Sequence, residues 1–288
     1  MTGKLKSYRG FDGFARSTVF RNILKERLKT LNVAFICFYG SRNYGLESPQ
    51  SDYDFFIVYY PSFDNFYDNR FERLSVIESD YDYFITPFHE YISHTLKGNV
   101  KFMEPFICGT VYLPAGGASA PSVKKMSLSG NTDANRLFAD IRRFIPLNYK
   151  KNFNAMTGIA NNKNQNIIKD LYTSNTLKYK ESHGYDIKEA INSLRVLFLL
   201  RHYIETGEFS FRVKDNPAYR DLEKYIDGIK SGLISKSGYL VIFDKVLSLA
   251  VKADSLAYRH GGLDAMEKKI NDSVRELCRK KACFEKKA

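Results

Sequence analysis

The stretch that most constrains this chain is residues 38–60, FYGSRNYGLESPQSDYDFFIVYY, which joins two apolar runs through a polar loop. The first run covers 33–39 and breaks at Gly40-Ser41, and the second covers 55–60. Both runs are short, rich in β-branched or aromatic residues and bounded by turn residues, which is typical of buried strands. We therefore expect two strands joined by a loop.

An acidic pair, Asp52 and Asp54, leads into the second run. Residues two apart in an extended chain point to the same side, so both carboxylates project together. Such close like charges repel each other and raise a pKa unless a cation lies between them. Mg²⁺ is the simplest such cation, because it prefers oxygen ligands and is often shared between carboxylates and a substrate phosphate. Gly40 removes the side chain where a phosphate would approach the backbone, and Ser41 could offer its N–H and hydroxyl.

Asp-x-Asp and Gly-Ser are each common by chance, but their order, about ten residues apart between two apolar runs, is much more specific. GSRNYGLESPQSDYD resembles the signature of the DNA polymerase β-like nucleotidyltransferase superfamily, in which Gly-Ser precedes an Asp-x-Asp pair on the next strand. More narrowly, it resembles predicted nucleotidyltransferases that are linked to RNA repair and also occur in bacteriophage genomes. The resemblance implies that Asp52 and Asp54 are catalytic metal ligands and that Gly40, Ser41 and Arg42 bind the nucleotide.

A third carboxylate is expected from residues 74–87, LSVIESDYDYFITP, which we interpret as a third strand. Asp80 and Asp82 share parity in it, so both could face the same way as the first acidic pair. Two-metal phosphoryl transfer normally uses a third carboxylate, which this superfamily takes from a neighbouring strand. The segment that follows resembles the family's stretch after its third Asp. Counting back from Lys97 in this segment favours Asp82 as the catalytic residue and metal ligand. Three further positions match that stretch: Lys97, Asn99 and Glu104. Of these, Glu104 could simply cap or brace a helix.

The second informative stretch is 184–209, GYDIKEAINSLRVLFLLRHYIETGEF. Its apolar residues recur at three and four, which predicts a helix with a wide buried face that ends at Gly207. Lys188, Asn192 and Arg195 form a second stripe, which is either a solvated face or a ligand-facing one. The stretch resembles the family's second motif, GY-x-x-K-x-x-x-H-x-x-R, and this implies that the three residues bind the nucleotide. Asn192 stands where the family usually has His, which puts standard activity in doubt.

Composition narrows the class of protein. Lys plus Arg exceed Asp plus Glu by 44 to 32, a net charge of +12 that favours polyanionic partners such as RNA or DNA. The four cysteines form no CxxC pair, and Cys37 lies in an apolar run, which suits a reduced, buried thiol. No stretch approaches the ~20 apolar residues that a membrane span needs. We expect a soluble, cytoplasmic protein.

The expected fold is α+β, with an N-terminal nucleotidyltransferase-type mixed sheet flanked by helices and a C-terminal helical domain. A change to Gly, Ala, Ser and Pro over 115–131 predicts a flexible connector between a catalytic domain, 1–114, and a helical domain, 132–288. Other predicted elements are a loosely held arm over 1–14, a helix at 18–31 capped by Ser17, and helices at 137–145, 149–160, 216–231, 239–258 and 263–280.

The functional hypothesis is a nucleotidyltransferase that uses Mg²⁺ (or Mn²⁺) and an NTP. Asp82 would assist deprotonation of an acceptor hydroxyl, which attacks the α-phosphate in line while pyrophosphate leaves. RNA or tRNA ends fit the positive charge best, whereas a protein or a small molecule would fit the same active site. A further alternative is an inactive relative that binds nucleic acid or protein, which the three carboxylates argue against and Asn192 favours.

Overall fold

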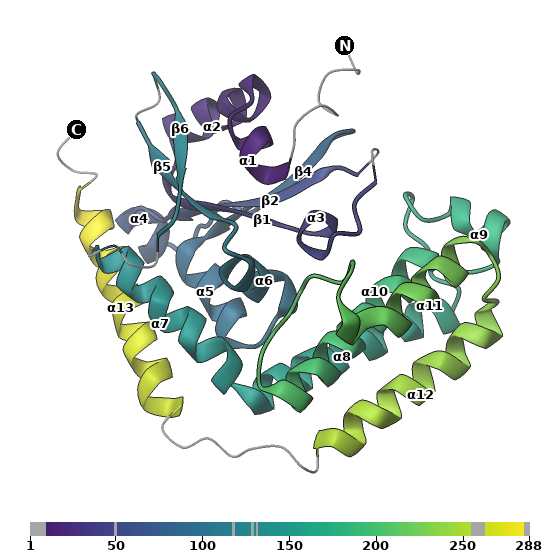
Figure 1. The fold of residues 1–288 in the computed structure, drawn as a ribbon. Helices are drawn as coiled ribbons and strands as arrows, with labels where there is room; N and C mark the ends of the chain where they lie inside the picture. Colours follow the sequence, from purple (N-terminus) through teal and green to yellow (C-terminus); the bar gives the residue numbers. More distant parts are fainter. Residues whose placement is uncertain are drawn as a thin grey trace. The chain divides into compact units, whose positions relative to one another are not determined.

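The computed structural model describes residues 10–48, 51–116, 119–127, 130, 132–254 and 263–284. Contacts divide the chain into two units. The first contains the described residues of Met1–Leu96, Lys101–Ile145 and Gly262–Ala288, and the second those of Lys97–Val100 and Pro146–Gly261. The α+β class is confirmed, because a mixed sheet with helices comes first and a helical region follows (Figure 1).

The sheet of the first unit has six strands within the described part of the chain, in the order β3-β4-β2-β1-β5-β6. Their bounds are β1 (Asn32–Tyr39), β2 (Tyr53–Tyr60), β3 (Leu74–Ile77), β4 (Tyr81–Pro87), β5 (Val111–Ala115) and β6 (Ser122–Lys125). β2 and β4 are parallel, and the other neighbouring pairs are antiparallel. The short helix α4 (Phe63–Tyr67) and β3 lie in the connection that a parallel pair requires.

The sheet differs from the sequence predictions in two segments. The single strand expected over 74–87 is wrong, because this segment is a hairpin of β3 and β4. β6 lies inside the stretch 115–131 that was predicted to be a connector. The domain boundaries themselves, 1–114 and 132–288, remain a prediction.

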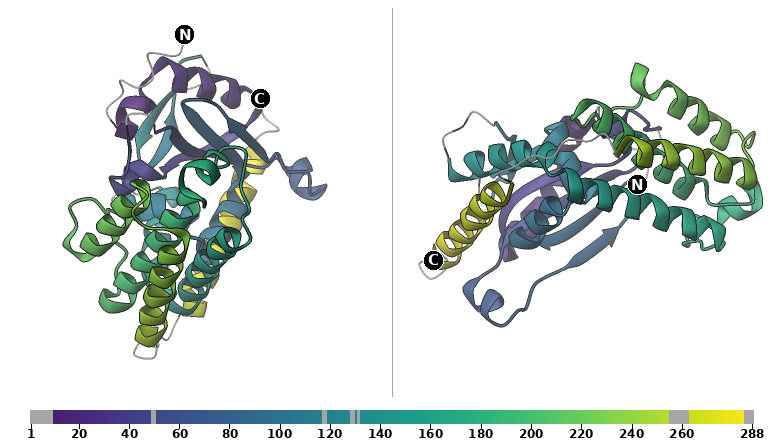
Figure 2. Two further views of the ribbon diagram at one scale, coloured as in Figure 1. Left: turned by 90° about the vertical axis from the view of Figure 1, so that its right-hand side faces the viewer. Right: turned by 90° about the horizontal axis from the view of Figure 1, so that it is seen from below.

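Alternating side chains of the strands face two layers of helices. One face packs against α1 (Gly10–Ala15) and α2 (Thr18–Thr30) in an aromatic core that includes Phe20, Phe38 and Phe55. Figures 1 and 2 show the other face covered by α5 (Phe88–Leu96), α6 (Val100–Cys108), α7 (Asp133–Leu147) and α13 (Leu263–Phe284). The predicted cap is confirmed, because the Ser17 hydroxyl accepts a hydrogen bond from the backbone N–H of Phe20 at 3.1 Å.

The arm predicted over 1–14 is wrong for residues 10–14, and residues 1–9 lie outside the described residues. Residues 10–14 belong to α1, whose Phe11 and Phe14 are buried. The ring of Phe14 stacks on that of Tyr53 with 4.2 Å between ring centroids. The helix is therefore anchored by the strand that carries the acidic pair.

The second unit consists of helices within the residues that the structure describes. They are α8 (Tyr149–Ile168), α9 (Lys178–His183), α10 (Ile187–Thr206), the 3₁₀ turn η2 (Pro217–Tyr219), α11 (Arg220–Lys230) and α12 (Lys236–Asp254). α10 packs against α8, α11 and α12. It begins after the Asp186 cap. It ends at Gly207, as predicted, with a φ of 76° at the glycine. Of the predicted helix 239–258, the last residues lie outside the described part.

No described helix combines the length and apolar character that crossing a membrane would require.

Candidate active site

Three strand ends of the first unit bring the predicted carboxylates together. Asp54 pairs with Tyr39 at the end of β1 on one side and with Asp82 at the start of β4 on the other. Asp52 immediately precedes β2. Each of the three acids offers a carboxylate oxygen, and these oxygens lie within 4.8 Å of one another. The predicted proximity is therefore confirmed, and the parallel register explains it, since Asp54 and Asp82 occupy one row of the sheet.

The carboxylates of this cluster are partly buried and lie close enough to repel one another. Burial, followed by the charges of Asp52 and Asp82, raises the pKa of Asp54 to about 7. Burial, followed by the charges of Asp54 and Asp82, also raises the pKa of the Tyr39 hydroxyl. A divalent cation would relieve this repulsion, and three carboxylates are the donors that a hard cation prefers. The residues therefore fit a divalent metal ion, as the sequence predicted.

Asp82 rather than Asp80 is the third carboxylate of the cluster. One Asp82 oxygen, Oδ1, accepts a hydrogen bond from the backbone N–H of Glu78 across the hairpin at 3.2 Å. Asp80 lies in the turn between β3 and β4, where its backbone carbonyl accepts from the Tyr53 N–H at 3.0 Å. The hairpin therefore orients the Asp82 carboxylate. Through Tyr53 it also positions the start of β2, beside Asp52 and Asp54.

Gly40 forms the turn that faces the cluster. Its φ is 96°, a conformation that favours glycine, and a Cβ there would lie 2.5 Å from Asp54 Oδ2. Ser41 follows as the first residue of α3 (Ser41–Tyr44). No hydrogen bond joins the Ser41 hydroxyl to another residue within the described part of the chain. The turn therefore brings bare backbone and one hydroxyl beside the acids.

Glu104 of α6 holds this turn in place and is fully buried. One of its oxygens, Oε1, accepts hydrogen bonds from the Gly40 N–H and from Asn43 Nδ2, each at 2.7 Å, and the Tyr44 hydroxyl donates to Oε2. A bracing role for Glu104 was one reading of the sequence. In the structure, Glu104 braces the Gly40 turn together with α3.

Arg42, predicted to bind the nucleotide, contacts the loop before the acidic pair. Its Nη2 donates to the Ser51 carbonyl at 2.7 Å, and its guanidinium lies 3.9 Å from the centroid of the Tyr53 ring. These contacts orient the residues on both sides of Asp52. A direct contact with a nucleotide remains a prediction for Arg42.

The comparison with protein families matches this region. Residues 19–97 fit the model of a nucleotidyltransferase domain. This region is a nucleotidyltransferase domain. It agrees with the resemblance to the DNA polymerase β-like superfamily, and it contains the Gly-Ser turn and all three carboxylates. The comparison with curated proteins found no match.

The match to a nucleotidyltransferase domain implies a general chemistry for the region that contains the cluster. Domains of this family transfer a nucleoside monophosphate, which implies an NTP as the donor substrate. The three carboxylates supply the kind of site that a divalent metal would occupy. The family match does not reach the second unit, so it does not cover the residues of α10.

Sequence reasoning missed Lys101, which lies just beyond the matched nucleotidyltransferase domain. Its Nζ lies 3.9 Å, 4.5 Å and 5.1 Å from the ring centroids of Phe84, Tyr39 and Phe56. Lys101 and Glu104 are three apart on α6 and so share one helix face, a spacing visible in the sequence. The partners come from three different strands, however, and no local pattern indicates them.

The nucleotide-binding residues predicted on α10 belong to the second unit. Lys188 is exposed, while Asn192 and Arg195 are half-buried. Arg195 Nη2 donates to Asn192 Oδ1 at 3.4 Å. A pocket of about 420 Å³ lies beside the start of α10, where Glu189 pairs with Lys163 at 2.7 Å, and its lining includes none of the three predicted residues. Their role toward a nucleotide stays a prediction.

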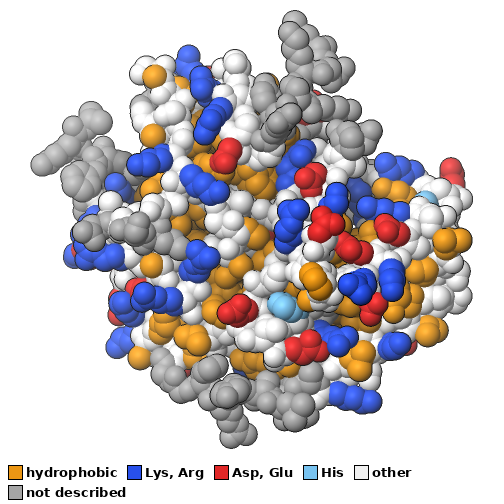
Figure 3. Space-filling view, viewed as in Figure 1, with side chains coloured by type: hydrophobic (Ala, Val, Ile, Leu, Met, Phe, Trp, Pro, Cys, Tyr) orange, Lys and Arg blue, Asp and Glu red, His pale blue; other side chains and the backbone are white. Residues whose placement is uncertain are grey.

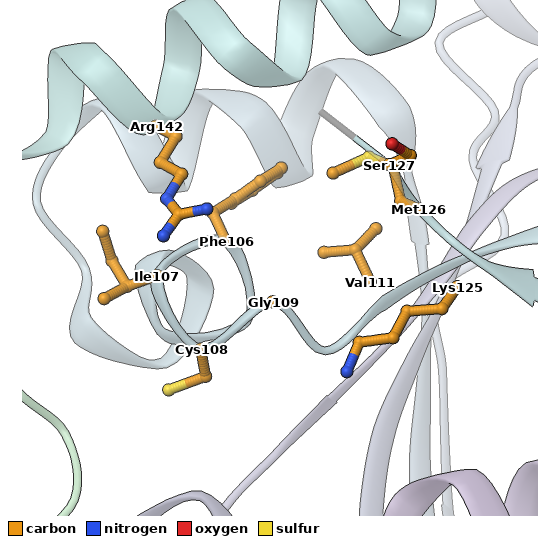
Figure 4. A pocket seen from close by; sticks show the side chains of 9 residues that line it. All are labelled: Phe106, Ile107, Cys108, Gly109, Val111, Lys125, Met126, Ser127 and Arg142. Carbon is orange, nitrogen blue, oxygen red and sulfur yellow. The ribbon is translucent and has the colours of Figure 1, made fainter. Parts of the chain in front are cut away.

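A second pocket, of about 520 Å³, lies at the C-terminal end of α6 in the first unit. Figure 4 shows Arg142 reaching from α7 toward the turn that holds Cys108 and Gly109. The lining of this second pocket contains none of the three carboxylates. We therefore assign this pocket no part in the candidate active site.

Proposed function

We propose that this chain is a metal-dependent nucleotidyltransferase that moves a nucleoside monophosphate from an NTP to a hydroxyl group of RNA. The observation that carries the proposal is the meeting of Asp52, Asp54 and Asp82 within 4.8 Å, beside the Gly40 turn. An acidic cluster alone would be a common surface feature. The supporting facts are its position at three strand ends and its place inside a nucleotidyltransferase domain.

Asp52, Asp54 and Asp82 would hold the metal, with Mg²⁺ preferred and Mn²⁺ as the substitute. When bound, such an ion supplies positive charge to the phosphate oxygens and to the attacking hydroxyl. Burial and neighbouring charges set the pKa of Asp54 at about 7, so at a pH above that value its carboxylate is ready to act as a ligand.

The protein groups position the NTP and move one proton. Gly40 and Ser41 would cradle the phosphates, because the turn offers bare backbone and a hydroxyl without another described partner. Asp82 would accept the proton of the acceptor hydroxyl. The oxygen then forms a bond to the α-phosphorus while the bond from that phosphorus to the bridging oxygen breaks, and pyrophosphate leaves with the electron pair.

RNA is the acceptor that the charge of the chain favours. A net charge of +12 attracts polyanions, and the narrower family resemblance is to nucleotidyltransferases linked to RNA repair. On the face of the molecule in Figure 3, Lys and Arg side chains are spread over the surface with Asp and Glu among them. Binding through such scattered cations would depend strongly on salt, because phosphate contacts release counterions.

The test is transfer of label from α-phosphate-labelled NTPs in the presence of Mg²⁺ or Mn²⁺, with total cellular RNA and total cellular protein as separate acceptors. We expect labelled RNA that ribonuclease degrades and protease does not. Protease-sensitive label would instead identify a protein acceptor and retain the active site. Absence of label with every NTP, metal and acceptor would favour the inactive relative that Asn192 suggests.

A further inference from the structure

We propose that Lys101 is a resident cation of the acidic cluster, which offsets part of its charge before any metal binds and thereby weakens metal binding to the nucleotide-free protein. The inference deepens the proposed function and rests on it, because it concerns the same three carboxylates. Lys101 is a positioning residue in this account, since it acts through the acids and the metal rather than on the substrate.

The first support is the place of Lys101 on the sheet. Tyr39, which contributes one of the rings under its ammonium, is the register partner of Asp54. Phe56 and Phe84 follow Asp54 and Asp82 by two residues, so their side chains lie on the same face as the two carboxylates. The ammonium therefore lies on the face of the sheet to which Asp54 and Asp82 point.

The second support is that aromatic rings hold the ammonium while its charge still acts on the acids. Cation–π contacts with Phe84 and Tyr39, at 3.9 Å and 4.5 Å, fix its position without neutralising its charge. The charges are coupled in both directions, because Lys101 lowers the pKa of Asp54 and the acids raise that of Lys101. Burial outweighs the acids, so the pKa of Lys101 is lowered overall.

The third support is the charge balance of the site. When ionised, the three carboxylates of the cluster carry three negative charges, and the Lys101 ammonium, on which the buried Glu104 also acts, offsets part of this charge. A divalent ion that enters must therefore approach a fixed like charge, at a cost that Coulomb's law makes appreciable in a partly buried site. The triphosphate of an NTP brings negative charge of its own, so nucleotide and metal would bind more readily together than the metal alone.

The experiment is calorimetric titration of the full chain with Mn²⁺ at pH 8.5, without nucleotide. Lys101→Met keeps the length of the side chain and removes its charge, and we expect it to bind Mn²⁺ about tenfold more tightly than the wild type. Lys101→Arg keeps the charge and should bind as the wild type does. Lys25→Met removes one charge from the exposed surface of α2, on the opposite face of the sheet, and should leave the affinity unchanged.

The direction of the change separates a charge effect from a packing effect. A Lys101→Met variant that binds Mn²⁺ more weakly, or equally well, would overturn the inference, and so would an Arg variant that behaves like the Met variant. Metal-free thermal unfolding of each variant checks that it is folded, so that a changed affinity is not a loss of folded protein. If the wild type itself binds no Mn²⁺, the proposed function fails as well, whereas Mn²⁺ binding that Asp54→Asn abolishes and Lys101→Met leaves unchanged defeats only the inference.

Discussion

The acidic cluster of the first unit and the polar stripe of α10 in the second were predicted from the same kind of pattern, and the structure treats them differently. Asp54 and Asp82 are placed by strand pairing, which carries side chains from distant parts of the sequence into one row. Lys188 and Arg195 are placed only by the helix that carries them both. A sheet register fixes which groups meet, whereas a helical stripe states only that its members share a face.

The most severe way to test the cluster is to remove its central acid. Asp54→Asn should lower metal-dependent transfer about 10³-fold, because the acid that we propose as the central metal ligand loses its charge. The fold should persist, since the amide has the same shape and removes like-charge repulsion. The measurement is the initial rate of label transfer at saturating NTP, together with circular dichroism.

Asp80→Asn is the matched control for this change. Asp80 lies in the same hairpin as Asp82 and outside the cluster, so the rate should stay within about twofold of the wild type. Equal losses in both variants would contradict a special role for the carboxylates of the cluster.

A smaller effect is expected at the turn that faces the cluster. Gly40→Ala places a Cβ 2.5 Å from Asp54 Oδ2 at a φ of 96°, so the turn or the carboxylate must shift. We expect transfer to fall about 100-fold and stability to fall by about 1 to 3 kcal/mol. Rates per folded molecule and chemical denaturation measure the two effects separately.

Gly207→Ala separates backbone strain from the contact with Asp54. Gly207 has a φ of 76°, and a Cβ there would meet nothing within 4 Å. This variant should lose stability and retain the rate per folded molecule. A loss of rate as large as that of Gly40→Ala would contradict the importance of the contact.

The pH dependence of stability and of metal affinity tests the repulsion among the three carboxylates, which has no counterpart in the α10 stripe. The folded pKa of Asp54, about 7, lies above the value of an unfolded aspartate, so the folded state holds its proton more tightly. Metal-free stability from this group is therefore present below about pH 4 and is lost as pH rises toward 7, by on the order of a few kcal/mol. Protons compete with metal around the folded pKa of about 7, so the affinity for Mg²⁺ should fall about tenfold from pH 8 to pH 6.

Asp54→Asn provides the control for both pH effects, because it has no proton to exchange at this position. Its metal-free stability should change less between pH 5 and pH 8 than that of the wild type, as measured by urea denaturation. An identical pH profile in the two proteins would mean that another group dominates the titration.

These contrasts also explain what the sequence could and could not predict. The two strands around the Gly-Ser turn were predicted because their composition and bounding turns are local signals, and the spacing of two in Asp52-x-Asp54 was enough to join the pair. The hairpin of β3 and β4 was missed because its turn at 78–80 contains no Gly or Pro and was read as strand. The helix α1 was missed because its stability comes from Phe14 packing on Tyr53, a contact that no local pattern encodes.

The α10 stripe gives the smallest and most informative expected effect. Lys188→Ala should raise the KM for the NTP about fivefold with kcat unchanged if its exposed ammonium contacts the triphosphate, since an exposed charge pair contributes little more. Arg201→Ala is the control on the same helix, because Arg201 is occupied by Glu205 at 2.7 Å. If both variants leave the KM unchanged, Lys188 belongs to a solvated face of α10. Helical spacing would then have predicted the helix correctly and its ligand wrongly, whereas Asp54 and Asp82 meet because the pairing of β2 with β4 sets them side by side.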